Sequence, residues 1–121
     1  MSAPPSVMLI NPPVTERQRS GPIGPVIRNL YFNSPPLGLA YLAAVLEREA
    51  VPVRLLDAAV EGLRPEETVA RIRGWNPDIV GLTSTTNFFC NALDLAQRLK
   101  AAMPGAVILI GGPHVTSNPQ P

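Results

Sequence analysis

Four short runs of hydrophobic residues are spaced along the chain. They lie at Ser6–Ile10, Val53–Asp57, Asp78–Ser84 and Val107–Gly111. Each run is nearly continuous in Val, Ile and Leu and does not alternate with polar residues. A strand inside a parallel sheet is covered by helices on both faces, so it carries apolar side chains at successive positions. The pattern therefore predicts four parallel strands that are buried on both sides.

The segments between these runs have the periodicity of amphipathic helices. We predict helices over about Pro36–Ala50, Pro65–Trp75 and Asn87–Met103, with Pro104-Gly105 ending the third. Apolar residues within each segment recur at spacings of three and four, which places them on one face. The positions expected to be buried are Leu39, Leu42, Ala43, Leu46, Val69, Ile72, Trp75, Phe89, Ala92, Leu93, Ala96, Leu99 and Met103.

The alternation of strands and helices predicts the fold class. Right-handed crossovers between parallel strands give an α/β, doubly wound parallel sheet with helices on both faces, a three-layer αβα architecture. A chain of 121 residues fits one domain, residues 1–121. A doubly wound domain normally continues with another helix and a fifth strand, so we expect this domain to be truncated after the fourth strand.

Composition and charge narrow the class of protein. Hydrophobic residues make up 45% of the chain and charged residues 16%, a normal balance for one globular core. The net charge is +1 with scattered basic residues, which argues against nucleic acid as a partner. There is no secretory signal and no apolar run near the roughly 20 residues of a membrane span. Together with a single cysteine, this predicts a cytoplasmic protein that does not contact a membrane.

Candidate chemistry follows from the fold, because open α/β sheets bind ligands beyond the carboxyl ends of their strands. Three segments leave such ends: Asn11–Pro13, Thr83–Asn87 and Gly111–His114. The residues expected to bind a cofactor are Asn11, Pro12, Pro13, Thr83, Ser84, Thr85, Thr86, Asn87, Gly111, Gly112, Pro113 and His114.

Each of these segments also has a purely structural interpretation. The hydroxyls of 83–86 suit phosphate or amide groups at a helix N-terminus, whereas Thr86 or Asn87 alone would simply cap that helix. Gly111-Gly112 lets a bulky group approach the backbone, or forms an ordinary tight turn. His114 is a ligand contact, a cap or a surface residue, and we do not predict that it binds a metal.

Two further residues are expected to be structural. Asp57 ends the second run, where an acid can bind a ribose, but the G-x-G-x-x-G turn of dinucleotide-binding folds is absent and so is a Walker A pattern. Asp57 is therefore predicted to bond loop backbone. Cys90, the single cysteine, is predicted to be buried and inert, and alone it cannot hold an iron–sulfur cluster or a structural zinc.

Four motifs, in this order, carry a family resemblance. They are Asn11-Pro12-Pro13, PPLGLAYLAA at 35–44, PDIVGLTS at 77–84 and IGGPH at 110–114. From about Val7 to Thr116 the chain resembles the N-terminal cobalamin-binding domain of B12-dependent radical SAM proteins. The resemblance implies a flavodoxin-like domain that presents a corrinoid to a downstream radical SAM barrel.

The resemblance also implies how the cofactor is held. Thr83 falls at the Ser or Thr position that faces the nucleotide tail, and Gly111 and Gly112 match the glycine pair that lines the channel of that tail. The histidine of the Asp-x-His-x-x-Gly motif that ligates cobalt in methionine-synthase-like domains has no counterpart in the first loop, 11–35. Cobalamin is thus expected to bind in the base-off form, without a protein histidine as a ligand of the cobalt. Its lower face is expected to be covered by Ile23, Val26, Ile27, Leu30, Tyr31 and Phe32.

A radical SAM cluster needs three closely spaced cysteines, and this sequence contains one. The 4Fe-4S cluster and S-adenosylmethionine are therefore expected in a missing or partner domain, and this chain is expected to be a non-catalytic module of a methyltransferase or cyclase. One alternative is a stand-alone flavodoxin-like regulatory or interaction domain without cofactor. Another is a dehydrogenase or flavin enzyme, which the missing glycine-rich turn disfavours.

Overall fold

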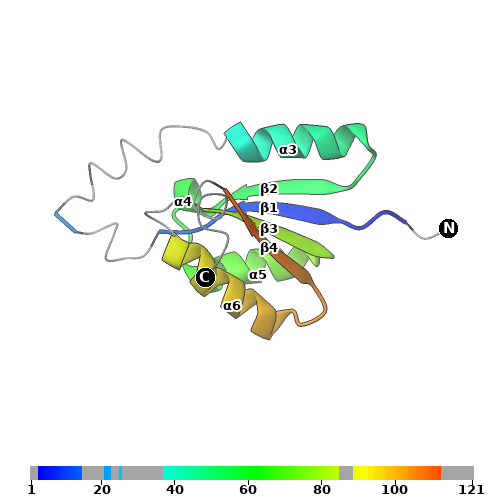
Figure 1. Ribbon diagram of the computed structural model, residues 1–121. Helices are drawn as coiled ribbons and strands as arrows, with labels where there is room; N and C mark the ends of the chain where they lie inside the picture. Colours follow the sequence, from blue (N-terminus) through cyan, green and yellow to red (C-terminus); the bar gives the residue numbers. More distant parts are fainter. Residues whose placement is uncertain (1–2, 15–20, 23–24, 26–36, 85–88, 113–121) are drawn as a thin grey trace.

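A four-stranded parallel sheet forms the centre of the computed structural model, which describes residues 3–14, 21–22, 25, 37–84 and 89–112 (Figure 1). The strands are adjacent in the order β2-β1-β3-β4. Their bounds are Val7–Asn11 for β1, Val53–Asp57 for β2, Ile79–Thr83 for β3 and Val107–Gly111 for β4. The helices are α3 at Leu37–Arg48, α4 at Ala58–Glu61, α5 at Pro65–Trp75 and α6 at Phe89–Ala102.

The path between the strands confirms the doubly wound, flavodoxin-like topology. From β1 the chain moves outward to β2, then crosses back past β1 to pair β3 with its other edge. β4 then extends the sheet beyond β3. The strand order therefore reverses between β1 and β3, which is the switch point where ligands of open α/β sheets bind.

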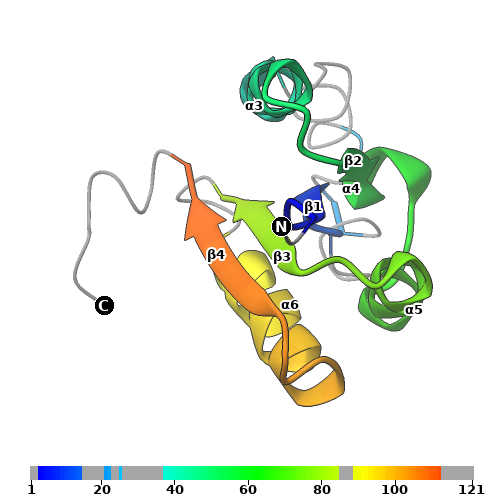
Figure 2. The same cartoon turned by 90° about the vertical axis from the view of Figure 1, so that its right-hand side faces the viewer.

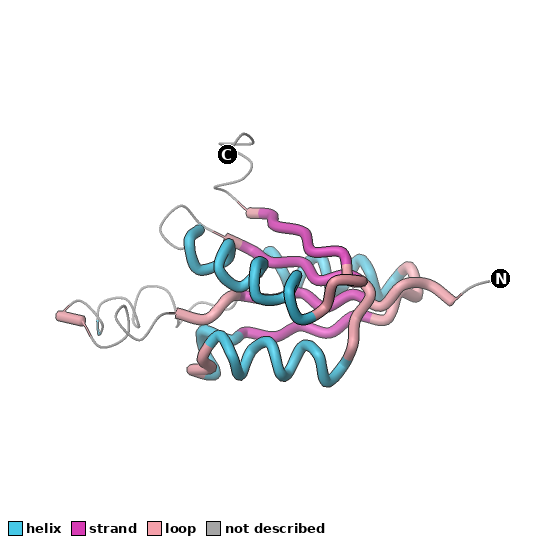
Figure 3. The backbone as a smooth tube through the Cα atoms, turned by 90° about the horizontal axis from the view of Figure 1, so that it is seen from below, coloured by secondary structure: helices cyan, strands magenta, loops and turns pink. Residues whose placement is uncertain are grey.

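The two faces of the sheet bury different sets of side chains. Alternate residues of a strand point to opposite faces. Met8, Ile10, Val80 and Leu82 belong to the larger core, which packs against α5 and α6. Val7, Leu9 and Ile79 belong to the smaller core, with Leu39 of α3. Figure 2 shows α3 on one side of the sheet and α5 and α6 on the other, the three layers that the sequence predicts, and Figure 3 views α5 and α6 running beside the strands.

The expectation that every strand is covered on both faces is wrong for the two edge strands, because Leu55 of β2 is 40% exposed and one face of β4 is uncovered. On the face of α3, Val107 is 52% exposed and Leu109 is 55% exposed. The described part of α3 packs on β1 and β2 and does not reach β4. Ile108 and Ile110, on the opposite face, do pack against the larger core. The continuous apolar pattern therefore marks β4 as a strand but does not show that both its faces are buried.

The predicted helix stripes are correct in part. Ile72 of α5 and Leu99 of α6 are fully buried. Leu42 of α3 and Leu93 of α6 were expected inside, but they are 51% and 42% exposed. In α6 the buried position is Leu95, at 0%, because it lies three residues after Ala92 and four before Leu99 and so shares their face.

Periodicity did not predict the short helix α4. Asp57 caps its first turn, because the Asp57 carboxylate accepts a hydrogen bond from the backbone N–H of Val60 at 3.1 Å. Gly62 ends it in the left-handed conformation with φ 69°. A single turn is too short for a helical repeat to be visible in the sequence. Only the two capping residues, Asp57 and Gly62, could have indicated this helix.

Candidate functional site at the carboxyl edge of the sheet

The described residues predicted to bind a cofactor lie at one edge of the sheet. All four strands run in the same direction, so their carboxyl ends meet at this edge (Figure 1). Asn11 ends β1 and pairs in register with Asp57, and Thr83 ends β3 and pairs with Gly111. Because β1 and β3 are neighbours, both pairs lie beside the switch point.

Ser84 connects the ends of β3 and β4. Its backbone N–H donates to the Gly111 carbonyl at 2.9 Å, and its hydroxyl donates to the same oxygen at 3.4 Å. The residue is 3% exposed. These bonds satisfy a buried polar group locally. Ser84 therefore has a structural role, and its predicted contact with a cofactor stays a prediction.

Gly111, which ends β4, and Gly112, which follows it, occupy different environments. Gly112 has φ +110°, and an added Cβ would lie 2.4 Å from the Ser84 carbonyl oxygen and 2.9 Å from the Ser84 nitrogen. Only glycine fits there. An added Cβ on Gly111 would have nothing within 4 Å. Its strand partner is Thr83, so the open space at Gly111 lies beside the Thr83 side chain.

A polar pair lies across the ends of β1 and β2. The Asn11 side-chain Nδ2 donates to Asp57 Oδ1 at 2.9 Å, and the same oxygen accepts the N–H of Val60 at 3.1 Å. Asp57 therefore bonds backbone, as predicted, but the N–H belongs to the first turn of α4 and not to a loop. The Asn11 contact was missed, although Asn11 directly follows the first apolar run and Asp57 ends the second, which in adjacent parallel strands places them at one edge.

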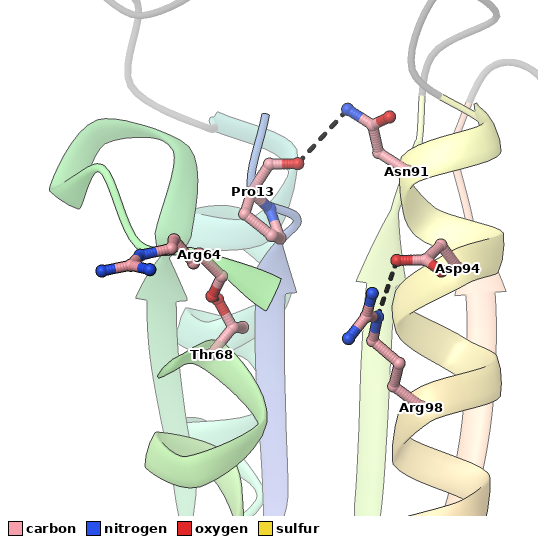
Figure 4. Close-up of polar contacts among 6 residues, drawn as sticks. All are labelled: Pro13, Arg64, Thr68, Asn91, Asp94 and Arg98. Atoms are coloured by element: carbon pink, nitrogen blue, oxygen red, sulfur yellow. Dashed lines mark hydrogen bonds and ion pairs between the residues drawn. The ribbon is translucent and has the colours of Figure 1, made fainter. Parts of the chain in front are cut away.

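The segment after β1 contacts the start of α6. The Asn91 side-chain Nδ2 donates to the Pro13 carbonyl at 3.2 Å, and Pro13 is buried (Figure 4). A small pocket of about 180 Å³ adjoins this contact. It is lined by Pro13, Pro65, Cys90, Asn91, Asp94 and Leu95.

The prediction that Cys90 is buried is wrong, because its side chain is exposed. Cys90 precedes the buried Ala92 by two residues, and positions two apart point to different faces of a helix. The apolar pattern around a residue did not show which face of the helix it occupies.

A larger pocket, of about 320 Å³, lies at the opposite edge of the sheet. Asp78 and Ala106, which directly precede β3 and β4, are among its lining residues. Ligands of parallel α/β sheets bind at the carboxyl ends of the strands, so we do not assign this pocket to the site.

Some of the predicted site lies outside the described residues. This holds for five of the predicted binding residues, namely Thr85, Thr86, Asn87, Pro113 and His114, and for the predicted apolar cover at Ile23, Val26, Ile27, Leu30, Tyr31 and Phe32. Within the described ranges, no group of three or more His, Cys, Asp or Glu side chains is placed to hold a metal ion. In the same ranges, no helix is long and apolar enough to cross a membrane.

Comparison with known proteins identifies the family. The B12 binding domain family matches residues 23–121, most of the chain. The chain belongs to this B12-binding family. The resemblance predicted from the sequence, to the cobalamin-binding domain of B12-dependent radical SAM proteins, is thereby confirmed. No solved structure shows a significant match.

Three curated relatives give the B12-binding domain its context. An uncharacterized methyltransferase of Pyrococcus horikoshii is 40% identical over 71% of this chain and 18% of its own length. The cytidylyl-2-hydroxyethylphosphonate methyltransferase of Streptomyces wedmorensis is 31% identical over 94% of this chain and 23% of its own length. The anaerobic magnesium-protoporphyrin IX monomethyl ester cyclase of Rubrivivax gelatinosus is 34% identical over 69% of this chain and 15% of its own length. The matches thus span less than a quarter of each relative.

Proposed function

We propose that this B12-binding domain holds cobalamin at the carboxyl edge of its sheet, as the cofactor-binding module of a radical SAM methyltransferase or cyclase. The observation that carries the proposal is the open space at Gly111. Gly111 pairs in register with Thr83 on the neighbouring strand β3, and the polar pair of Asn11 and Asp57 lies farther along the same edge, at the ends of β1 and β2. At Gly111 a flat or bulky group can reach the backbone without meeting a side chain.

The residues at this edge fit the chemistry of cobalamin. The nucleotide tail offers an apolar base and a phosphate, and a strand end without a Cβ accommodates the base closely. Thr83 supplies a hydroxyl that donates or accepts a hydrogen bond. When bound, cobalamin would supply a cobalt centre able to carry a methyl group, and this chain would hold and orient it.

The proposed binding mode is base-off without a protein histidine below the cobalt. It is supported by the segment that follows β1, 12–36, which contains no histidine. His114, the single histidine of the chain, follows β4 instead. A lower face without a protein nitrogen donor favours transfer of a methyl group to a radical.

The radical chemistry is proposed to belong to another part of the enzyme. One cysteine cannot hold a 4Fe-4S cluster, so the cluster and S-adenosylmethionine would be bound by a further domain in cis or by a separate partner. Relatives that are named methyltransferases and a cyclase support this assignment. We further propose a cytoplasmic location, on the basis of the single cysteine.

Reconstitution with hydroxocobalamin tests the proposal. The purified chain is incubated with hydroxocobalamin and desalted, and its absorption spectrum is recorded. We expect a retained corrinoid spectrum of the base-off type. A folded protein that stays colourless would contradict the proposal and would favour the stand-alone regulatory domain.

Two glycine variants make this experiment specific to the site. Gly111→Val puts a branched side chain into the open space while keeping a residue that suits a strand. Gly105→Val is the matched control, because Gly105 also has nothing within 4 Å of an added Cβ but lies before β4, at the opposite edge. We expect Gly111→Val to lower cobalamin affinity at least about tenfold, and Gly105→Val to leave it unchanged. Equal affinity in both variants would contradict the placement of the site.

A further inference from the structure

The hydrogen bond between Asn11 and Asp57 determines how the Asn11 amide is oriented. An ionised carboxylate only accepts hydrogen bonds, so the atom of Asn11 that faces Asp57 must be the NH₂ nitrogen. The Asp57 oxygen that accepts it is itself held by the N–H of Val60 in the first turn of α4. The orientation of the amide is therefore tied to the backbone of α4 and does not depend on Asn11 alone.

This arrangement leaves two groups of the Asn11 amide available to a ligand, namely its carbonyl oxygen and its second N–H. Among the contacts of the described residues, Asp57 is the one partner of the Asn11 side chain. The Oδ1 atom of Asn11 accepts no hydrogen bond from these residues. Asn11 is half-buried at the carboxyl end of β1, beside the switch point. A ligand at this edge thus meets a carbonyl oxygen, which needs an N–H or O–H donor, beside an N–H of the same amide, a pair of groups that a primary amide can match with one donor and one acceptor.

We propose that Asp57 is a positioning residue that presents the Asn11 carbonyl oxygen to an amide group at the rim of the corrin. The proposal rests on the function proposed above and adds a polar specificity contact to it. Cobalamin carries primary amides around its ring, and these supply N–H donors. A carboxylate at the same point would face the Asn11 oxygen and, behind it, the negative charge of Asp57. The site therefore selects an amide over an acid.

Corrinoids altered at one amide test this selection. The probes are cobalamin and its derivatives in which a single peripheral propionamide is hydrolysed to a carboxylic acid, and their affinities are measured by absorption titration. We expect the wild type to bind at least one acid derivative about tenfold more weakly than cobalamin. In Asn11→Ala the affinities for cobalamin and for the acid derivative should differ by no more than about twofold, because the oxygen that distinguishes an amide from an acid is gone.

Asp57→Asn separates positioning from fold stability. Asn caps a helix as well as Asp does, so α4 and the thermal unfolding midpoint should be retained. The neutral amide of the variant no longer dictates which atom of Asn11 faces it. The ratio of the affinity for cobalamin to the affinity for the acid derivative should therefore drop at least about threefold. Asp78→Asn is the matched control, since Asp78 directly precedes β3 at the opposite edge of the sheet, where it bonds Ser6. It should keep the full ratio.

The outcomes distinguish this inference from the proposed function. A wild-type chain that binds no corrinoid overturns both. A wild type that binds cobalamin and every acid derivative equally overturns the amide contact alone. If Asn11→Ala abolishes selection while Asp57→Asn retains it fully, Asn11 is a contact residue, and the positioning role of Asp57 is overturned.

Discussion

At the scale of single residues, the carboxyl edge of the sheet contains some residues that are tightly packed and others that face open space. Gly112 packs its backbone against Ser84, and Ser84 in turn bonds the Gly111 carbonyl. These contacts hold the ends of β3 and β4 together. Gly111 itself contacts nothing on its Cβ side. A pair of glycines that resembles one motif in the sequence therefore has two separate physical roles.

Alanine substitutions should separate those two roles. Gly112→Ala places a Cβ against backbone atoms at a positive φ, and we expect the free energy of unfolding to fall by at least about 2 kcal/mol. Gly111→Ala adds a methyl group in open space within a strand and should change it by less than about 0.5 kcal/mol. Urea unfolding followed by circular dichroism measures both. Equal losses would contradict the distinction.

At the scale of elements, the helices are positioned by stripes that run beside the sheet. In α6 the stripe passes through Ala92, Leu95 and Leu99, each fully buried. Leu93 and Cys90 lie on other faces of the helix and are exposed. The stripe fixes the rotation of α6, and that rotation brings Asn91 to the Pro13 carbonyl.

Truncation of two leucines in α6 tests the position of that stripe. Leu95→Ala removes a side chain that is 0% exposed and should cost about 2–5 kcal/mol of the free energy of unfolding. Leu93→Ala, at 42% exposed, should cost less than about 1 kcal/mol. Thermal and urea unfolding of the two variants provide the comparison. A larger loss for Leu93→Ala would require a different rotation of the helix.

At the scale of the whole molecule, the two faces of the sheet are covered unequally. α5 and α6 pack on one face across all four strands, whereas α3 lies over β1 and β2 on the other. Val107 and Leu109 are therefore exposed beside α3. Their neighbours along β4, Ile108 and Ile110, are packed.

Paired threonine substitutions on β4 test this asymmetry. Threonine retains the β-branched shape that strands favour while removing apolar surface. The double variant Val107→Thr/Leu109→Thr should unfold at nearly the same urea concentration as the wild type. Ile108→Thr/Ile110→Thr places hydroxyls against the larger core and should lose about 2–5 kcal/mol of the free energy of unfolding. If both double substitutions were equally destabilising, the face of β4 that carries Val107 and Leu109 would have to be covered in solution.

The sequence by itself determined the strands, the three longer helices and the edge of the sheet at which a site would form. These follow from local periodicity and from the handedness of crossovers, and neither requires knowledge of distant contacts. It also carried the family resemblance, because the motifs are contiguous in the chain. The short helix α4 escaped it, because one turn has no repeat.

The tertiary structure alone decided which side chains meet. Asn11 and Asp57 are 46 residues apart in the sequence and become partners only through the register of β1 with β2. Gly112 is restricted to glycine by Ser84, a residue of another strand end. The exposed face of β4 depends on where α3 lies. A pattern of apolar residues states that a position is suitable for burial, but whether another element covers it is settled only by packing.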